Sequence, residues 1–182
     1  MQEDAMWLKP SRPSFSRKTR LKLALWLVIQ KTLFRISPSK RFRIWLLNIF
    51  GANVQRTCFV SPTATIYMPW NLVMGDRSSI DFETLVYNLD RVTIGDFVSI
   101  SYRVNINTGS HDCGDPYFRL ITNPIFIGSG VFVGAEAYLG PGVKIGLMAV
   151  IGARSVVIKD MPSAFICVGH PCKPIKIREK TS

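Results

Sequence analysis

An aliphatic residue followed by glycine recurs every six positions through the last third of the chain. A small or aliphatic residue follows each aliphatic position by four. The pairs are Ile127-Gly128, Val133-Gly134, Leu139-Gly140, Ile145-Gly146 and Ile151-Gly152. An α-helix repeats every 3.6 residues and a strand every two, so neither generates this period. A short fixed period is typical of a β-solenoid, whose coils bury their aliphatic residues only by stacking on one another.

Three hexads would complete one triangular coil of about eighteen residues, with glycine after the aliphatic residue suited to the corner geometry. The repeat continues upstream in looser form. The register slips by two residues near Leu72–Met74 and again between Val86 and Ile94, which we interpret as corner insertions. From Val60 to Pro162 we therefore expect about five coils.

The repeat is interrupted at length after Ile106, and the next regular hexad starts at Ile127. The intervening segment 112–126 is rich in turn-forming and polar residues and cannot follow the coil path. We expect an excursion loop there. Loops held on a rigid scaffold often carry binding residues.

The pattern predicts an all-β fold, a parallel β-helix, preceded by a helical segment. Residues 17–35 and the stretch between Pro38 and Gly51 each place apolar residues on a helical stripe. We expect three parts. These are a basic amphipathic helical segment (1–52), the β-helix with its excursion loop (53–162) and a basic tail that packs on the last coils (163–182).

The net charge of +11 is placed unevenly, because residues 1–50 hold eleven Lys and Arg against two Asp and Glu. The longest apolar run there, Leu23–Ile29, is too short to span a bilayer. Two compatible interpretations remain for residues 17–50: they cap the open end of the β-helix, or they rest on an anionic membrane leaflet. Nucleic acid binding is not expected, since no recognised motif accompanies the charge.

We expect a cytoplasmic protein, because residues 1–20 carry no recognisable secretory signal. Its four cysteines show no metal-ligand spacing and are expected to be reduced thiols. Only two histidines occur. His170 lies in a Gly-His-Pro turn, and His111 lies at the start of the excursion loop among polar residues. His111 suits a general base, although a solvated polar residue would have similar neighbours.

The chain resembles the hexapeptide-repeat O-acetyltransferases related to the maltose and galactoside acetyltransferases. The resemblance rests on Thr108–His111 before the loop and on two later motifs, Val157–Pro162 and Gly169–Lys173. The stretches Tyr67–Leu72 and Asn88–Asp96 are similar to the subgroup that serves colanic acid biosynthesis. The resemblance implies a left-handed parallel β-helix, acetyl-CoA as co-substrate, no metal and a homotrimer with the coenzyme groove between subunits.

The resemblance implies that His111 removes the proton from a sugar hydroxyl. Counting from the shared Val92–Asp96 stretch places Asp81 where the family has an active-site Asn, so Asp81 is a second catalytic candidate, with Asn88 as the alternative partner of His111. Asn88 and Asp112 are candidate acceptor contacts, as is the loop 112–123. The family's coenzyme-binding positions match Ala135, Ala153, Ile158, Lys159, Lys173 and Lys176.

The expected activity is O-acetylation of a sugar in exopolysaccharide or capsule biosynthesis, with a nucleotide-sugar or a lipid-linked acceptor. A γ-class carbonic anhydrase needs three zinc-binding histidines, so two histidines exclude it. Serine or xenobiotic O-acetyltransferases, and a non-catalytic scaffold at the membrane, remain as alternatives. Binding of coenzyme A would separate an enzyme from a scaffold.

Overall fold

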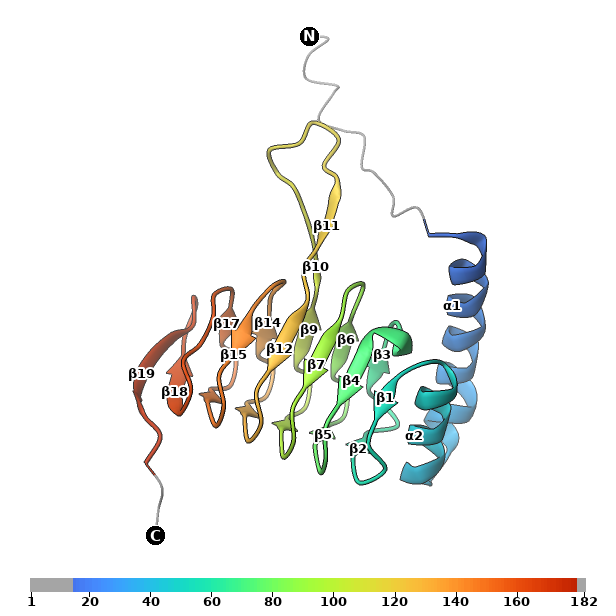
Figure 1. The fold of residues 1–182 in the computed structure, drawn as a ribbon, viewed down its shortest axis with the longest axis horizontal. Helices are drawn as coiled ribbons and strands as arrows, with labels where there is room; N and C mark the ends of the chain where they lie inside the picture. Colours follow the sequence, from blue (N-terminus) through green and yellow to red (C-terminus); the bar gives the residue numbers. More distant parts are fainter. Residues whose placement is uncertain (1–14, 180–182) are drawn as a thin grey trace.

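A left-handed parallel β-helix forms the body of the molecule, with helices across its N-terminal end and a hairpin projecting from its side (Figure 1). The computed structural model describes residues 15–179. The expected all-β solenoid with a helical segment and an excursion is confirmed. No helix within residues 15–179 is long and apolar enough to cross a bilayer.

Three sheets run along the solenoid, and each takes one strand from every coil. Sheet A contains β1 (Asn53–Val54), β4 (Leu72–Met74), β7 (Val92–Ile94), β12 (Ile125–Ile127) and β15 (Lys144–Ile145). Sheet B contains β2 (Phe59–Val60), β5 (Ser79–Ile80), β8 (Ser99–Ile100), β13 (Phe132–Val133), β16 (Val150–Ile151), β18 (Phe165–Val168) and β19 (Lys173–Ile177). Sheet C contains β3 (Thr65–Ile66), β6 (Leu85–Tyr87), β9 (Asn105–Asn107), β14 (Tyr138–Leu139) and β17 (Val156–Val157).

Each coil strand buries one residue in the core, or two where a strand of sheet A is three residues long. Val60, Ile80, Ile100, Val133 and Ile151 stack through sheet B and are at most 1% exposed. Glycine follows two of these positions, as Gly134 and Gly152, and it serves a purpose other than the corner geometry expected from the sequence. A Cβ on Gly134 would lie 2.5 Å from the backbone nitrogen of Ala153 in the next coil. Glycine is needed there because the coils stack closely, whereas non-glycine residues such as Glu136 adopt the positive φ of the corner.

The extra residues of the solenoid all enter at the same edge. We call the turns from sheet B to sheet C the B–C corner, and those from sheet C to sheet A the C–A corner. Paired residues in sheet A are 20 positions apart at first (Met74 with Ile94), 33 apart across the hairpin (Ile94 with Ile127) and 18 apart afterwards (Ile127 with Ile145). The two-residue slips seen in the sequence therefore lie at the C–A corner, one of them forming the 3-10 turn η3 (Pro69–Asn71). This corner also carries the excursion.

The excursion is an antiparallel hairpin of β10 (Gly109–His111) and β11 (Leu120–Thr122). Its base is closed by the backbone nitrogen of Asn123, which donates to the carbonyl of Thr108 at 2.9 Å. The excursion was expected at residues 112–126, but the hairpin both begins and ends earlier in the chain. The chain leaves the coil path at Thr108, and Ile125–Ile127 already pair with β7 as strand β12 because Ile125 and Ile127 fill the core.

The N-terminal helices close the first coil. Helix α1 (Arg17–Ile29) continues into a π-helical turn, η2 (Gln30–Phe34), and helix α2 (Lys40–Ile49) follows. Trp26 donates from its indole nitrogen to the Ile66 carbonyl at 2.6 Å, and the Gln30 side chain accepts from the Ile66 nitrogen at 2.7 Å. These side chains replace the strand partners that the first coil lacks. The other end is covered by β18 and β19, which pair antiparallel.

Candidate active site

The His111 side chain is held by a single residue of the hairpin, Phe118. Its Nδ1 lies 2.7 Å from the Phe118 carbonyl oxygen, and its ring stacks on the Phe118 ring with centroids 4.8 Å apart and planes 8° apart. A carbonyl oxygen only accepts, so Nδ1 carries the proton in the neutral ring. The lone pair is then on Nε2, the nitrogen that can act as a base.

The root of the hairpin fixes the position of His111 relative to the solenoid. The Thr108 hydroxyl bonds the Tyr87 carbonyl at 3.2 Å and accepts from the Asp90 nitrogen at 2.9 Å. On the returning strand, the Thr122 hydroxyl donates to the Asp90 carboxylate at 3.2 Å. Asp90 therefore joins both strands of the hairpin to the coil below.

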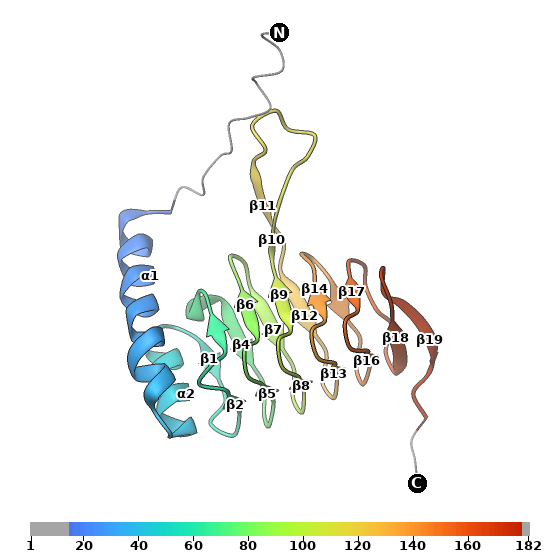
Figure 2. The ribbon, with the colours of Figure 1, turned by 180° about the vertical axis from the view of Figure 1, so that it is seen from behind.

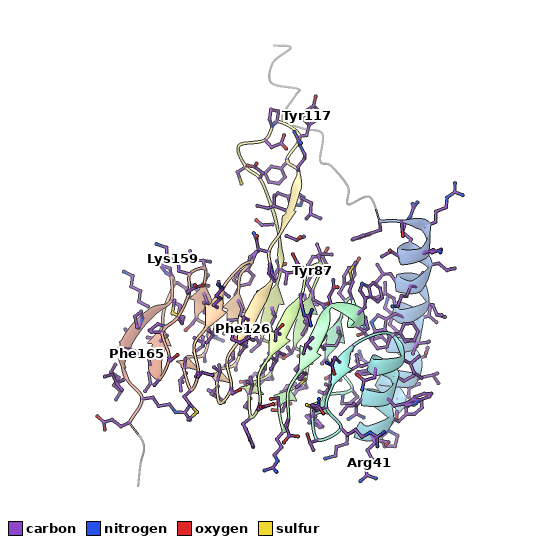
Figure 3. The ribbon with its side chains drawn as sticks, in the orientation of Figure 1. Arg41, Tyr87, Tyr117, Phe126, Lys159 and Phe165 are labelled. Atoms are coloured by element: carbon purple, nitrogen blue, oxygen red, sulfur yellow. The ribbon has the colours of Figure 1, made fainter. Side chains whose placement is uncertain are left out.

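The hairpin loop is ordered by its own acidic residues. Asp112 is exposed, and its carboxylate accepts from the Gly114 nitrogen at 2.9 Å. Asp115 forms an ion pair with Arg119. Tyr117, at the far end of the hairpin in Figure 3, is 50% exposed. These contacts lie within the loop, and they leave Asp112, next to His111 in the chain, open to solvent.

The two candidate partners of His111 lie elsewhere within a subunit. Asp81 lies at the B–C corner after β5, and its carboxylate accepts from the Phe82 nitrogen at 2.7 Å. Asn88 is fully buried and bonds both backbone groups of Met68, at 2.7 and 2.8 Å. Asn88 thus links two neighbouring coils, and the oxygen and the nitrogen of its side-chain amide both form hydrogen bonds. Neither side chain forms a hydrogen bond with His111 in residues 15–179; Phe118 takes that place.

The candidate coenzyme-binding residues divide between the same two corners and the tail. Ala135 and Ala153 stack at the B–C corner, where the Arg154 nitrogen donates to the Ala135 carbonyl at 2.8 Å. Ile158 and Lys159 follow β17 at the C–A corner, and both are exposed. Figure 3 shows Lys159 on the edge from which the hairpin projects. Lys173 and Lys176 lie on β19 and are also exposed.

A row of alternating charges runs along the B–C corner beside Ala135 and Ala153. Arg103 bridges Glu83 at 2.7 Å and Glu136 at 3.6 Å, and Arg154 pairs with Glu136 at 2.6 Å. The hydrogen bond and charge of Arg154 hold the pKa of the Glu136 carboxyl below its usual range. The two acidic and two basic side chains of this row therefore balance one another in charge.

The residues of the site therefore lie at two edges of one face. Asp81, Ala135 and Ala153 follow one corner of sheet C, and His111, Ile158 and Lys159 follow the other. Sheet C lies between them, and its outer surface carries Tyr67, Tyr87 and Tyr138. Tyr67 and Tyr87 pack with ring centroids 4.8 Å apart, and burial together with Tyr67 raises the pKa of Tyr87. Within residues 15–179, sheet C thus separates the two groups of candidate residues.

Sequence reasoning missed Phe118 as the residue that orients His111. The hydrogen bond uses the backbone carbonyl of Phe118, and a backbone group has no residue identity. Its aromatic ring seven positions after His111 was a visible signal, but only the hairpin register makes the two rings meet.

The similarity of the chain to known proteins identifies its family. WcaF of Escherichia coli, named as a colanic acid biosynthesis acetyltransferase, is 36% identical over 163 residues, which is 88% of this chain and 90% of WcaF. The chain belongs to the hexapeptide-repeat acetyltransferases. A solved structure of a galactoside acetyltransferase in complex with coenzyme A is 27% identical to this chain in sequence. The two structures superpose with a TM-score of 0.82, and the match covers 91% of this chain and 85% of the galactoside acetyltransferase chain. No family model matches the sequence.

Structures of more distant proteins agree on the fold. A maltose O-acetyltransferase from Clostridium difficile 630 is 24% identical, with a TM-score of 0.82 over 99% of this chain and 98% of its own. The match to WcaF shows that the protein is an acetyltransferase, and the structural match shows the same solenoid fold. Within residues 15–179, no group of three or more His, Cys, Asp or Glu side chains is arranged to hold a metal ion.

Proposed function

We propose that this hexapeptide-repeat acetyltransferase transfers the acetyl group of acetyl-CoA to a sugar hydroxyl, with His111 as the general base. The observation that carries the proposal is the hydrogen bond from Nδ1 of His111 to the Phe118 carbonyl. It leaves Nε2 free to accept a proton at the point where the hairpin leaves the solenoid. The length and identity of the match to WcaF support a polysaccharide-related acceptor.

In the proposed reaction, Nε2 of His111 accepts the proton of the acceptor hydroxyl as its oxygen attacks the thioester carbonyl. The new C–O bond gives a tetrahedral intermediate whose oxyanion needs hydrogen-bond donors, and backbone N–H groups at a coil corner are the natural source. When the C–S bond breaks, the imidazolium returns the proton to the departing thiolate. His111 thus acts first as base and then as acid, with no acyl-enzyme intermediate.

The residues at the B–C corner and on the tail suit a long anionic co-substrate. The small side chains of Ala135 and Ala153 leave room for an extended chain along the corner, and Ile158 offers an apolar contact that is 55% exposed. Lys159, Lys173 and Lys176 are exposed and form no ion pair within residues 15–179, so they are free to bind phosphates. We therefore assign coenzyme binding to these six residues.

The division of the site between two corners supports a homotrimer. A threefold axis facing sheet C would bring the C–A corner of one subunit against the B–C corner of the next. His111 of one subunit would then meet Asp81, Ala135 and Ala153 of its neighbour, and Asp81 would contact the imidazole across the interface. Closed cyclic assemblies with such heterologous contacts are a common form of oligomer.

The acceptor is assigned to the hairpin side of the site. Asp112, which follows His111 in the chain, and the ring of Tyr117 farther along the hairpin are both exposed, and such groups commonly contact sugars. We infer a sugar unit of an exopolysaccharide such as colanic acid, acetylated in the cytoplasm where acetyl-CoA is available. Asn88 is left out of the acceptor site because its amide is committed to Met68.

The test is titration calorimetry of acetyl-CoA into the wild type and a His111→Ala variant, followed by transfer assays on nucleotide-sugar and lipid-linked acceptors. We expect both proteins to bind the coenzyme with similar affinity. Transfer by the variant should fall by about 10²–10⁴-fold, the range of a general base. Wild-type turnover in His111→Ala would contradict the mechanism, and no coenzyme binding by folded wild type would favour a scaffold.

A further inference from the structure

The N-terminal helices have a second apolar face, which points away from the solenoid. Leu21, Leu25 and Val28 are 74%, 55% and 61% exposed, and their spacing places them on one side of α1. The opposite side of the same helix buries Leu23 and Trp26, and the indole of Trp26 bonds the first coil. A helix that only capped the solenoid would need one apolar face, so the outer face requires another explanation.

Exposed apolar side chains also occur after α1 in the chain, and the whole helical segment is strongly basic. Leu33, Ile36, Trp45 and Ile49 add exposures of 54%, 79%, 54% and 58%. Eight of the nine Lys and Arg side chains between residues 15 and 50 are exposed, and this stretch contains no Asp or Glu. None of the eight forms an ion pair within the described residues. We call the surface formed by these exposed apolar and basic side chains of residues 17–49 the basic cap face.

A cavity of about 870 Å³ opens at the edge of the basic cap face, between α2 and the turn after β1. Lys40, Arg41 and Arg56 line it together with Trp45. Three cations around one opening suit phosphate oxygens, and an exposed indole is typical of proteins that lie at a membrane interface. Ile44, Asn48 and Thr57 complete the lining.

We propose that the basic cap face binds the surface of an anionic lipid bilayer, with headgroup phosphates at the Lys40–Arg41–Arg56 cavity and the apolar side chains inserted between headgroups. Charge complementarity selects this partner. A second copy of the chain would place unpaired cations against unpaired cations, and nucleic acid would not use an apolar stripe of this length. Amphipathic helices with basic and apolar residues on one surface bind in the plane of a membrane.

This placement orients the whole molecule. Both views of the fold show the helices across one end of the solenoid, so the bilayer would lie across the solenoid axis (Figure 2). His111 follows the third coil, and two coil spacings plus one helix diameter put it roughly 20 Å from the outer surface of the cap. In the proposed trimer, the three caps would face the same membrane.

The test is flotation of the full chain with phosphatidylcholine vesicles and with vesicles that also contain phosphatidylglycerol. We expect binding to the anionic vesicles only, weakened by added salt. A Leu21→Gln, Leu25→Gln variant should bind at least about tenfold more weakly, because two inserted side chains are lost. Neutralising Arg17, Arg20 and Lys31 with Gln should weaken binding by roughly a hundredfold. The matched control, Phe126→Gln with Leu147→Gln, removes similarly exposed apolar groups from the solenoid and should bind as the wild type.

Several outcomes would overturn the proposal. They are wild-type protein that stays unbound, equal binding to both kinds of vesicle, and a Leu21→Gln, Leu25→Gln variant that binds as tightly as the control. A change in oligomeric state of that variant by sedimentation would instead assign the face to a contact between copies. Coenzyme titration of the same variants separates this test from that of the transferase function, since vesicle binding does not depend on acetyl transfer.

Discussion

At the scale of single residues, backbone groups and close packing decide what each side chain can do. The imidazole of His111 is oriented by the backbone carbonyl of Phe118, seven residues later. The side-chain amide of Asn88, a polar candidate in the sequence, already forms hydrogen bonds with the backbone of Met68. The glycines of the repeat show the same principle, because a Cβ on Gly128 would come within 2.8 Å of the backbone nitrogen of Leu147. The type of each residue in the sequence does not show whether it serves catalysis, links coils or allows close packing.

The cysteines differ in reactivity for a physical reason that can be tested. Burial raises the pKa of the Cys167 thiol to about 11, and burial also raises the pKa of Cys58 and of Cys172. A raised pKa keeps these thiols protonated at neutral pH, and alkylation requires the thiolate. We expect iodoacetamide to label only the exposed Cys113 in the folded protein and all four cysteines after unfolding.

Mass spectrometry of the intact protein measures this labelling. A Cys113→Ser variant should remain unlabelled while folded. Rapid labelling of Cys58 or Cys167 in the native protein would show that the ends of the solenoid open more readily than their burial implies.

At the scale of elements, the helical cap and the tail complete a solenoid that has unpaired strand edges at both ends. The Arg43 side chain is 3% exposed and donates to the Val60 carbonyl at 2.9 Å, and burial lowers its pKa. Trp26 and Gln30 bond the same coil. The cap is therefore part of the folded unit, and removal of residues 17–50 would expose the first coil.

Two tryptophans of the cap provide a matched comparison. Trp26 is fully buried with a bonded indole, whereas Trp45 is 54% exposed. Trp26→Ala should lower the free energy of unfolding by about 3–5 kcal/mol, because it leaves a cavity and an unpaired Ile66 carbonyl. Trp45→Ala should change it by no more than about 0.5–1 kcal/mol.

Urea titration followed by circular dichroism gives both values. Equal, small effects of the two substitutions would mean that the cap docks weakly on the first coil. A Trp26→Phe variant, which keeps most of the packing and loses the hydrogen bond, should fall between the two.

At the scale of the whole molecule, the arrangement of the corners decides whether the site is complete. His111 and Asp81 are separated by the width of sheet C within a subunit. The proposed trimer joins them at an interface, so every active site would belong to two chains. This arrangement can be distinguished from a site within one subunit by mixing inactive variants.

We expect His111→Ala and Asp81→Asn homo-oligomers to be weak transferases, and their mixture to regain activity after unfolding and refolding together. In a random equal mixture, about a quarter of the interfaces would combine an intact His111 with an intact Asp81 from the neighbour. Transfer assays on the refolded mixture measure the recovery. A mixture no more active than its parents would place both residues in one subunit or remove Asp81 from the site.

The sequence pattern was sufficient to predict the solenoid, its three-hexad coil, the corner insertions and the place of the excursion. These follow from a local period, because each inward residue recurs at a fixed interval and buries itself on its neighbours in the stack. The tertiary structure alone decided the bounds of the hairpin, the tautomer of His111 and the commitment of Asn88. It also separated the two edges of the site and the two apolar faces of α1. Those features depend on which residues of distant coils and strands meet, and a one-dimensional pattern does not contain that information.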